Sequence, residues 1–442
     1  MSAPRKRVLP TEPVVAHLES LAHDGRGIAH LEGKAVFIDG ALPGETVAFR
    51  YTARHGKHDE GRVSNVLVPS PERVEPRCLH AAICGGCSLQ HLAPQAQIEA
   101  KQQVLIENLD RIGGVRPETL LEPLSGAVWG YRYKARLGVK HVVKKGRVLV
   151  GFREKGSSYL ADLSGCEILH PRVGTRLTGL QGLISQLSIS DRIPQIEVAV
   201  GDDAAALVFR VLDSPTENDV ERLQRFARNC NLHLYLQPKG PDSLSLLWPA
   251  ASELSYRLPA YGLELGFLPT DFTQINPDIN RKMIDHALRL LAPGPNESVL
   301  DLFCGLGNFT LPLARRAAQV TGVEGDAGLV ARARQNARRN GIGNVVFHVA
   351  NLVGLTGQEC WVRNGYDKAL LDPPRSGAAA LLPQLRRLAP GSLVYVSCHP
   401  SSLARDAGLL IREAGYRLAA AGVMDMFPHT AHVESIALFE RR

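Results

Sequence analysis

The chain has 442 residues, of which 45% are hydrophobic and 21% charged, and it carries a formal net charge of +7. This length allows two or three domains with full hydrophobic cores. No apolar run approaches the roughly 18 residues of a membrane span, and no apolar stretch typical of a secretory signal follows the basic N-terminus. We therefore expect a cytoplasmic protein with no membrane partner, whose positive charge favours a polyanion.

Residues 12–70 have the pattern of a small β-barrel. Hydrophobic and polar residues alternate in "KAVFIDG" (34–40) and "ETVAFRY" (45–51), and turn residues recur about every 8 to 12 positions. The phrase "GALPGETV" (40–47), with "HDGRGIAH" (23–30) upstream, resembles the TRAM module, an OB-like RNA-binding barrel. This resemblance implies an N-terminal domain that contacts RNA.

Three cysteines stand close together after this barrel. Cys78, Cys84 and Cys87 are followed by Cys166 in "ADLSGCEILHP". Disulfides are rare in the cytoplasm, where clustered thiols more often bind a metal. Four thiolates suit either a zinc ion or an iron–sulfur cluster, and the C-x2-C spacing alone does not distinguish the two.

Residues 71–262 are expected to form a β-rich central domain. Within it, the segment 94–114 begins with Pro and ends with a Gly pair, which predicts a helix that is a candidate for packing on the C-terminal domain. From Ala127 to Lys155, nine Lys and Arg residues accompany a single acid, Glu154. Aromatic residues lie between them, and we expect this stretch to neutralise phosphates and to stack on unpaired bases. The aromatic residues are Trp129, Tyr131, Tyr133 and Phe152.

Residues 263–442 alternate between strands and helices, which predicts a doubly wound α/β domain with a mainly parallel sheet. The strand 299–303 runs into Gly305-Leu306-Gly307 and a helix, a turn in which glycine lets the backbone approach a ligand. The next strand ends at Glu324, where a carboxylate can bond ribose hydroxyls. The pattern indicates a cofactor that contains adenosine. A dinucleotide would favour a third glycine where this chain has Thr310.

Two later strands extend this pattern. The phrase "DLFCGLG" (301–307) resembles motif I of S-adenosylmethionine-dependent methyltransferases, in which the third strand supplies a polar residue near the adenine, here Asn351. The fourth strand ends in Asp372-Pro373-Pro374-Arg375, at the edge of the sheet where ligands bind. An aromatic residue in place of Arg375 would indicate methylation of an exocyclic amine, so the arginine favours another acceptor.

A cysteine and a glutamate stand at the ends of the last strands. "LVYVSCHP" (393–400) places Cys398 after a buried strand, and "HTAHVES" (429–435) places Glu434 at the head of the closing strand. C5 of uracil becomes nucleophilic when a thiolate adds to C6, and a base must then remove the C5 proton so that the thiolate can leave. Cys398 suits the nucleophile and Glu434 suits the base.

These motifs and "FTQIN" (272–276) occur in the order and spacing of the RNA uracil-5-methyltransferase family, which the C-terminal half resembles throughout. The resemblance implies that Cys398 is the nucleophile and Glu434 the base. It also implies an S-adenosylmethionine site formed by Gln274, Phe303, Asn308, Glu324, Asn351 and Asp372. The family has Asn or Asp where this chain has His399, and the effect of His399 on the thiolate is open.

The TRAM module and the four cysteines most resemble the branch of this family that methylates 23S ribosomal RNA at the uracil-1939 type of site and carries a [4Fe-4S] cluster. This implies that Cys78, Cys84, Cys87 and Cys166 are cluster ligands, with zinc as the alternative. We expect a monomer that acts on a uracil in a loop or flipped out of its stack.

Other activities would suit parts of this pattern. C5 methylation of another ribosomal RNA site or of tRNA is an alternative within the family. A nucleic-acid amine methyltransferase would transfer its methyl group independently of Cys398. A non-catalytic RNA chaperone would bind RNA unchanged by the cofactor and form no product.

Overall fold

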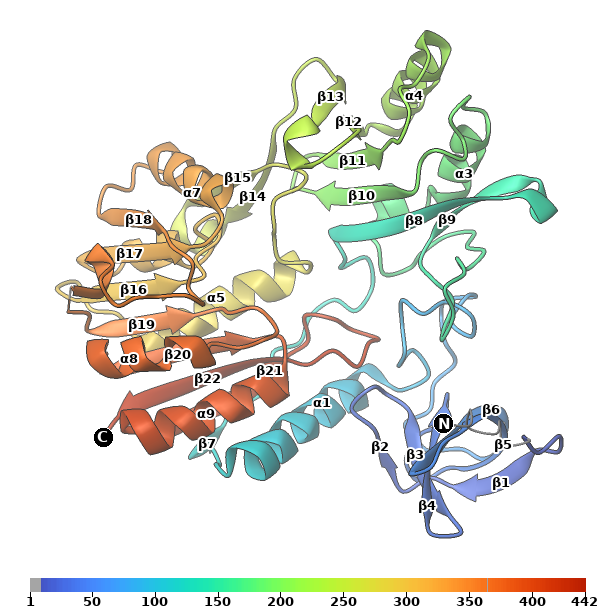
Figure 1. Ribbon diagram of the computed structural model, residues 1–442, viewed down its shortest axis with the longest axis horizontal. Helices are drawn as coiled ribbons and strands as arrows, with labels where there is room; N and C mark the ends of the chain where they lie inside the picture. Colours follow the sequence, from blue (N-terminus) through green and yellow to red (C-terminus); the bar gives the residue numbers. More distant parts are fainter. Residues whose placement is uncertain (1–8, 364) are drawn as a thin grey trace, which may run out of the picture.

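The computed structural model describes residues 9–363 and 365–442 and arranges them around three large sheets (Figure 1). The N-terminal sheet has the order β1-β5-β6-β4-β3-β2. Its strands are β1 (Val14–His17), β2 (Ser20–Leu21), β3 (Gly27–Leu31), β4 (Lys34–Asp39), β5 (Thr46–Arg54) and β6 (His58–Val68). Every second residue of β4 and β5 enters a small core that contains Val36, Ile38 and Phe49, as the alternation in the sequence predicts.

The central sheet has the order β13-β12-β11-β10-β8-β9 and is mainly antiparallel. Its strands are β8 (Lys134–Val142), β9 (Arg147–Gly151), β10 (Gln195–Val200), β11 (Ala205–Arg210), β12 (His233–Gln237) and β13 (Ser245–Trp248). Three helices accompany it: α2 (Pro171–Gly174), α3 (Leu177–Ser185) and α4 (Glu217–Cys230). A hairpin of β14 (Leu254–Leu258) and β15 (Leu263–Phe267) leads from this sheet into the C-terminal sheet.

The C-terminal sheet has eight strands in the order β18-β17-β16-β19-β20-β22-β21-β7. In chain order they are β7 (Thr119–Leu120), β16 (Ser298–Leu302), β17 (Gln319–Glu324), β18 (Val345–Val349), β19 (Lys368–Leu371), β20 (Ser392–Ser397), β21 (Tyr416–Met424) and β22 (Glu434–Arg441). The strands from β18 to β20 are parallel, and β22 runs antiparallel to β20 and β21. This doubly wound sheet confirms the predicted α/β class.

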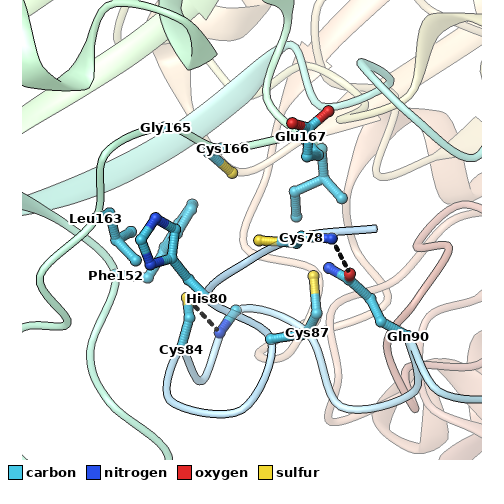
Figure 2. A pocket seen from close by; sticks show the side chains of 13 residues that line it. Cys78, His80, Cys84, Cys87, Gln90, Phe152, Leu163, Gly165, Cys166 and Glu167 are labelled. Carbon is cyan, nitrogen blue, oxygen red and sulfur yellow. Dashed lines mark hydrogen bonds between the residues drawn. The ribbon is translucent and has the colours of Figure 1, made fainter. Parts of the chain in front are cut away.

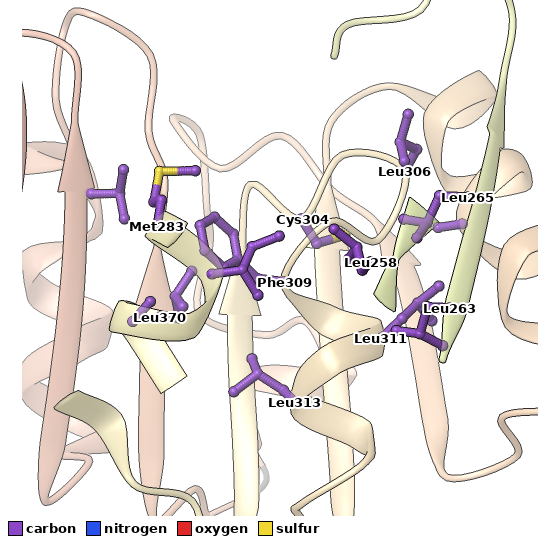
Figure 3. Close-up of a cluster of buried hydrophobic side chains, with 14 of the residues drawn as sticks. Leu258, Leu263, Leu265, Met283, Cys304, Leu306, Phe309, Leu311, Leu313 and Leu370 are labelled. Carbon is purple, nitrogen blue, oxygen red and sulfur yellow. The ribbon is translucent and has the colours of Figure 1, made fainter. Parts of the chain in front are cut away.

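Helices cover both faces of this sheet. One face carries α5 (Pro277–Leu291), α6 (Thr310–Ala314) and α7 (Ala327–Arg339), and Met283, Phe309 and Leu313 pack there against Leu370 of β19 (Figure 3). The other face carries α1 (Pro94–Asn108), α8 (Leu382–Leu388) and α9 (Pro400–Ala414). Successive strand residues alternate between the two cores, which explains the continuous hydrophobic runs in the parallel strands.

The segment before the central sheet belongs in space to the C-terminal sheet. Helix α1 packs against α9, and β7 pairs with β21 at the sheet edge (Figure 1). Lys101 of α1 forms a buried ion pair with Asp425, with 2.6 Å between Nζ and Oδ1. None of the helices in the described part of the chain combines the length and the hydropathy needed to cross a lipid bilayer.

Candidate active site

The turn after β16 is built around glycine. Gly305 and Gly307 have φ of +54° and +97°, a backbone region that side chains rarely adopt, and Phe303 shares it at +64°. The backbone N–H of Gly305 donates to Glu324 Oε2 at 3.1 Å. Glu324 Oε1 accepts from the N–H groups of Gly325 and Asp326. The carboxylate at the end of β17 is thereby fixed beside the glycine turn.

The remaining predicted cofactor residues lie at or near the same carboxyl edge. Asp372 follows β19 and accepts a long hydrogen bond, 3.4 Å, from Gln274 Nε2. Asn351 follows β18. Its side chain is exposed, and its Oδ1 accepts a hydrogen bond from the backbone N–H of Val353. The side-chain amide of Asn308 is bonded to Asn280 and accepts from the Tyr256 hydroxyl.

Cys398 directly follows β20, and Glu434 is the first residue of the neighbouring antiparallel strand β22. The last backbone pair of β20 with β22 joins Ser397 to Ser435, so Cys398 follows one member of this pair and Glu434 precedes the other. Glu434 is 4% exposed, whereas Cys398 is part-buried and lines an open groove. The sheet thus places a thiol and a carboxyl group together at one edge, as the sequence predicts from the ends of their strands.

The electrostatics of this edge favour protonated acids. Burial, and then the charges of Glu434 and Asp372, raise the pKa of the Cys398 thiol to about 11, and Arg375 acts in the opposite direction. Burial and the charge of Glu324 raise the pKa of Asp372 to about 7. Burial, and then Asp372, raise the pKa of Glu434 well above its ordinary value. A positively charged ligand would reverse this balance, since it would stabilise the anions.

His399 does not face the thiol as a partner. Its Nδ1 bonds Ser402 Oγ at 3.1 Å, and Ser402 Oγ donates to the backbone oxygen of Arg375. Because the hydroxyl hydrogen goes to Arg375, Nδ1 of His399 is the donor in the first bond. His399 therefore joins the start of α9 to the loop that follows Asp372.

Cys398 opens into a groove of about 950 Å³. The walls come from separate parts of the chain that include the N-terminal barrel, the loop that holds Cys84 and Cys87, helix α1, the start of α9 and the segment before β22. Three arginines line it, Arg111, Arg132 and Arg375, against two acids, Asp24 and Glu107. A groove of this polarity suits a polyanion.

The four predicted ligand cysteines surround a second, smaller cavity. Figure 2 shows the sulfur atoms of Cys78, Cys84, Cys87 and Cys166 directed toward one space. Apolar side chains of Phe152, Leu163 and Ile168 line the same cavity. The described chain holds these thiols free rather than as disulfides.

Burial makes this cavity a poor place for unpaired thiolates. It raises the pKa of Cys87 to about 12 and that of Cys166 to about 11. Hydrogen bonds offset part of this effect: Gly86 N donates to Cys84 Sγ, and N–H groups of Leu169 and Ile168 act on Cys166. A bound cation would stabilise the thiolate forms of the four cysteines in this apolar cavity. The four sulfurs fit a zinc ion and an iron–sulfur cluster equally.

The interpretation of the aromatic residues in 127–155 as a base-stacking surface is wrong for Tyr131. Tyr131 is 3% exposed and donates to the backbone oxygen of Pro428. Phe152 lines the cysteine cavity, and Trp129 is partly covered because it stacks on His429. Tyr131 and Trp129 thus contact the segment before β22, which sequence spacing could not indicate.

The structure adds a buried acid that sequence analysis did not single out. Asp301 is fully buried beneath the glycine turn and accepts a hydrogen bond from the Thr310 hydroxyl. Burial raises the pKa of Asp301 to about 8, and the charges of Asp372 and Glu324 act in the same direction. The hydrogen bond from Thr310 acts in the opposite direction. The signal in the sequence was an ionisable residue in the middle of an otherwise apolar strand.

Comparison with known proteins gives matches over the whole chain. The family model described as tRNA (Uracil-5-)-methyltransferase matches residues 261–360, and the TRAM domain model matches residues 15–50. The chain is 57% identical to 23S rRNA (uracil(1939)-C(5))-methyltransferase RlmD of Nitrosococcus oceani, over 99% of this chain and 98% of that protein. It is 56% identical to the protein of the same name from Alkalilimnicola ehrlichii, again over 99% of this chain and 98% of that one.

A solved structure has the same fold. The tRNA (uracil-54, C5)-methyltransferase of Pyrococcus abyssi, in complex with S-adenosyl-L-homocysteine, superimposes with a TM-score of 0.74 at 24% identity. The match covers 96% of this chain and all of that chain. Together with the TRAM match, it confirms a Rossmann-like methyltransferase fold with an OB-like N-terminal barrel.

Proposed function

The chain belongs to the 23S rRNA (uracil(1939)-C(5))-methyltransferase family, and we propose that it methylates C5 of that uracil in 23S ribosomal RNA. It is an S-adenosylmethionine-dependent RNA methyltransferase with a TRAM domain. The observation that carries the proposed site is the proximity of Cys398, just after β20, to Glu434, at the start of β22, whose charge acts on the pKa of the thiol.

In the proposed mechanism, Cys398 acts as the nucleophile. Its thiolate adds to C6 of the uracil, and the electron pair of the C5–C6 double bond moves toward the C4 carbonyl, which makes C5 nucleophilic. S-adenosylmethionine, when bound, supplies the methyl group that C5 takes. Arg375 is the cation beside the thiol and favours its ionised form.

Glu434 acts as the base in the second half of the reaction. Its carboxylate takes the C5 proton, the electrons of the C5–H bond form the C5–C6 double bond, and the bond from C6 to sulfur breaks. Cys398 leaves as a thiolate, and Glu434 is left as a neutral acid. The raised pKa of Glu434 makes its carboxylate a stronger base than an exposed glutamate.

We assign the cofactor to the glycine turn and the acids around it. Glu324 suits the ribose hydroxyls, and Asn351 at the end of β18 suits the adenine. Gln274 and Asp372, which are bonded to each other, suit the charged part of the molecule. A positive sulfonium next to buried Asp372 would lower the pKa of that carboxyl group. Phe303 and Asn308 complete the proposed site.

We assign a [4Fe-4S] cluster to Cys78, Cys84, Cys87 and Cys166, with zinc as the alternative. Four thiolates leave no iron position open to substrate, so these residues hold the loop of residues 78–87 in shape. The groove next to this loop is the proposed path of the RNA. We propose that the protein acts as a monomer in the cytoplasm, whose reducing conditions suit free thiols.

The experiment that tests the proposal uses 23S RNA fragments with 5-fluorouracil at the target, S-adenosylmethionine, and either the native protein or Cys398→Ala. Fluorine at C5 cannot leave as a proton does, so the native protein should form a denaturation-resistant adduct with RNA and the variant should not. Mapping the adduct identifies the nucleotide, including a second ribosomal site or a tRNA site. Methyl transfer that survives Cys398→Ala without any adduct would instead indicate an amine methyltransferase.

A further inference from the structure

The loop of residues 425–433, between β21 and β22, ends at the proposed base Glu434. It is not held by its own strands alone. Lys101 Nζ donates to Asp425 Oδ1 and to the backbone oxygen of Phe427, and the Tyr131 hydroxyl donates to that of Pro428. We asked what holds the part of this loop that is nearest to Glu434.

The segment directly after Cys87 provides one attachment. The backbone N–H groups of Ser88 and Leu89 both donate to the carbonyl oxygen of His429, at 2.9 and 3.0 Å. Ser88 Oγ accepts from the backbone N–H of Ala431 at 3.1 Å. The loop is thus bonded three times to the two residues that follow a proposed cluster ligand.

Helix α1 provides the second attachment through one fully buried side chain. Gln97 Oε1 accepts from the backbone N–H of His429 at 2.8 Å. Its Nε2 donates to the carbonyl oxygens of Leu89 and Leu92 at 3.0 and 2.7 Å. One amide group therefore bonds both the loop before Glu434 and the segment after Cys87.

The backbone at the centre of these bonds is in an unfavourable conformation. His429 has φ of +63°, a left-handed value that residues other than glycine rarely adopt, and it is 2% exposed. Its ring stacks on Trp129 with 4.0 Å between centroids. Such a conformation persists where its surroundings fix it, and in enzymes it is typical of parts that position reacting groups.

We propose that Gln97 and Ser88 are positioning residues for the proton removal by Glu434, through their bonds to His429 and Ala431. The inference rests on the proposed role of Glu434. In that step the C5 proton passes to Glu434, the C5–H electrons form the C5–C6 double bond, and Cys398 leaves C6 as a thiolate. Cys398 is held by β20 and the start of α9 instead, so loosening the 425–433 loop slows release more than attack.

The test compares Gln97→Met with Gln95→Met, in RNA that carries ordinary uracil and in the presence of S-adenosylmethionine. Gln95 lies on the same helix but is exposed and bonds only Glu99 among the described residues. We expect Gln97→Met to accumulate a denaturation-resistant, methylated protein–RNA adduct. Release of the RNA from this adduct should slow by roughly 10- to 100-fold, because misplacement of a reacting group by about 1 Å has an effect of this size. Gln95→Met should behave like the native protein. Metal content should be unchanged in both.

Three further results separate the alternatives. Ser88→Ala, which removes one hydroxyl, should accumulate the same adduct to a smaller extent. This variant tests the proposal if Gln97→Met does not fold. A second result would overturn this inference alone. In it, Glu434→Gln accumulates the adduct, but Gln97→Met and Ser88→Ala both release the adduct at the native rate. Glu434→Gln that forms no adduct overturns the proposed role of Glu434, and with it the basis of the inference.

Discussion

Cys398 follows Ser397 and Glu434 precedes Ser435, and Ser397 and Ser435 form the last pair of the ladder between β20 and β22. Glu434 belongs to β22, where it pairs with Met424 of β21, whereas Cys398 lies just beyond the end of β20. The charge of Glu434 acts directly on the pKa of the Cys398 thiol. A nucleophile and a base for the same ring can be held in this way without a mobile loop between them.

Glu434→Gln should separate the two halves of the reaction. Removal of a general base typically costs about 10²- to 10⁴-fold, so multiple turnover should fall by this factor while the first methyl transfer continues. Single-turnover assays with labelled methyl groups and denaturing gels measure both quantities. Glu440→Gln, at the other end of β22, is the matched control and should keep native turnover.

The reactivity of the Cys398 thiol should respond in opposite directions to two substitutions. Glu434→Gln removes a negative charge and should lower the thiol pKa from about 11, whereas Arg375→Met removes a positive charge and should raise it. Alkylation of the Cys398 peptide, followed against pH by mass spectrometry, measures the midpoint, since the thiolate is the reactive form. Shifts in the same direction in both variants would contradict this account of the site.

If the four cysteines bind the proposed metal or cluster, Cys166→Ser should remove it, although Cys166 is distant in sequence from the other three cysteines. Loss of one of four thiolate ligands weakens either a cluster or a zinc site, and the change should be seen in iron and zinc analysis and in the visible spectrum. Cys230→Ser is the control, because Cys230 is half-buried elsewhere in the central domain and should leave metal content unchanged. The native analysis also decides between iron and zinc.

Asp301 should make stability depend on pH. Its pKa is about 8 in the folded chain and 3.8 in a reference carboxyl group, so between these values the unfolded chain ionises while the folded chain keeps its proton. Ionisation then favours unfolding, and stability should fall as pH rises from about 4 to 8, by at most about 1.4 kcal/mol per pH unit. In Asp301→Asn this contribution is absent. The difference in thermal midpoint between variant and native protein should therefore grow in favour of the variant as pH rises.

Lys101→Met should destabilise the protein strongly, since it leaves Asp425 as a buried, unpaired charge. Breaking such a pair typically costs about 3 to 5 kcal/mol. Replacement of both partners, Lys101→Met with Asp425→Asn, should recover most of the loss. Thermal unfolding of the native protein, the single variant and the double variant measures this, and equal destabilisation in the last two would argue against the pair.

The sequence predicted the parts of the site that depend on strand ends. Cys398, Asp372 and Glu324 each follow or end a buried strand, and the rule that ligands bind at the carboxyl edge of a doubly wound sheet brings them together. Their proposed roles stay predictions, as do the domain boundaries at 12–70, 71–262 and 263–442.

Contacts between distant segments could not be predicted in the same way. Gln97 and Lys101 lie in the polar stretch "PQAQIEAKQQ" (94–103), which is typical of a solvated helix, yet both are buried against the 425–433 loop. Tyr131 and Phe152 resemble a base-stacking surface in sequence because local spacing does not reveal the cavity they line or cover. Asn308 matches a cofactor motif, but its amide is bonded to Asn280 and Tyr256.

The position of α1 and β7 on the C-terminal sheet has a consequence for how the chain folds during synthesis. Both segments leave the ribosome before the central sheet, whereas their partners α9, β21 and Asp425 are made near the end. Until then the buried faces of α1, including Lys101, have nothing to pack against. The barrel and the central sheet can form early, but completion of the C-terminal sheet must wait for nearly the whole chain, which makes the nascent protein dependent on protection from aggregation at this stage.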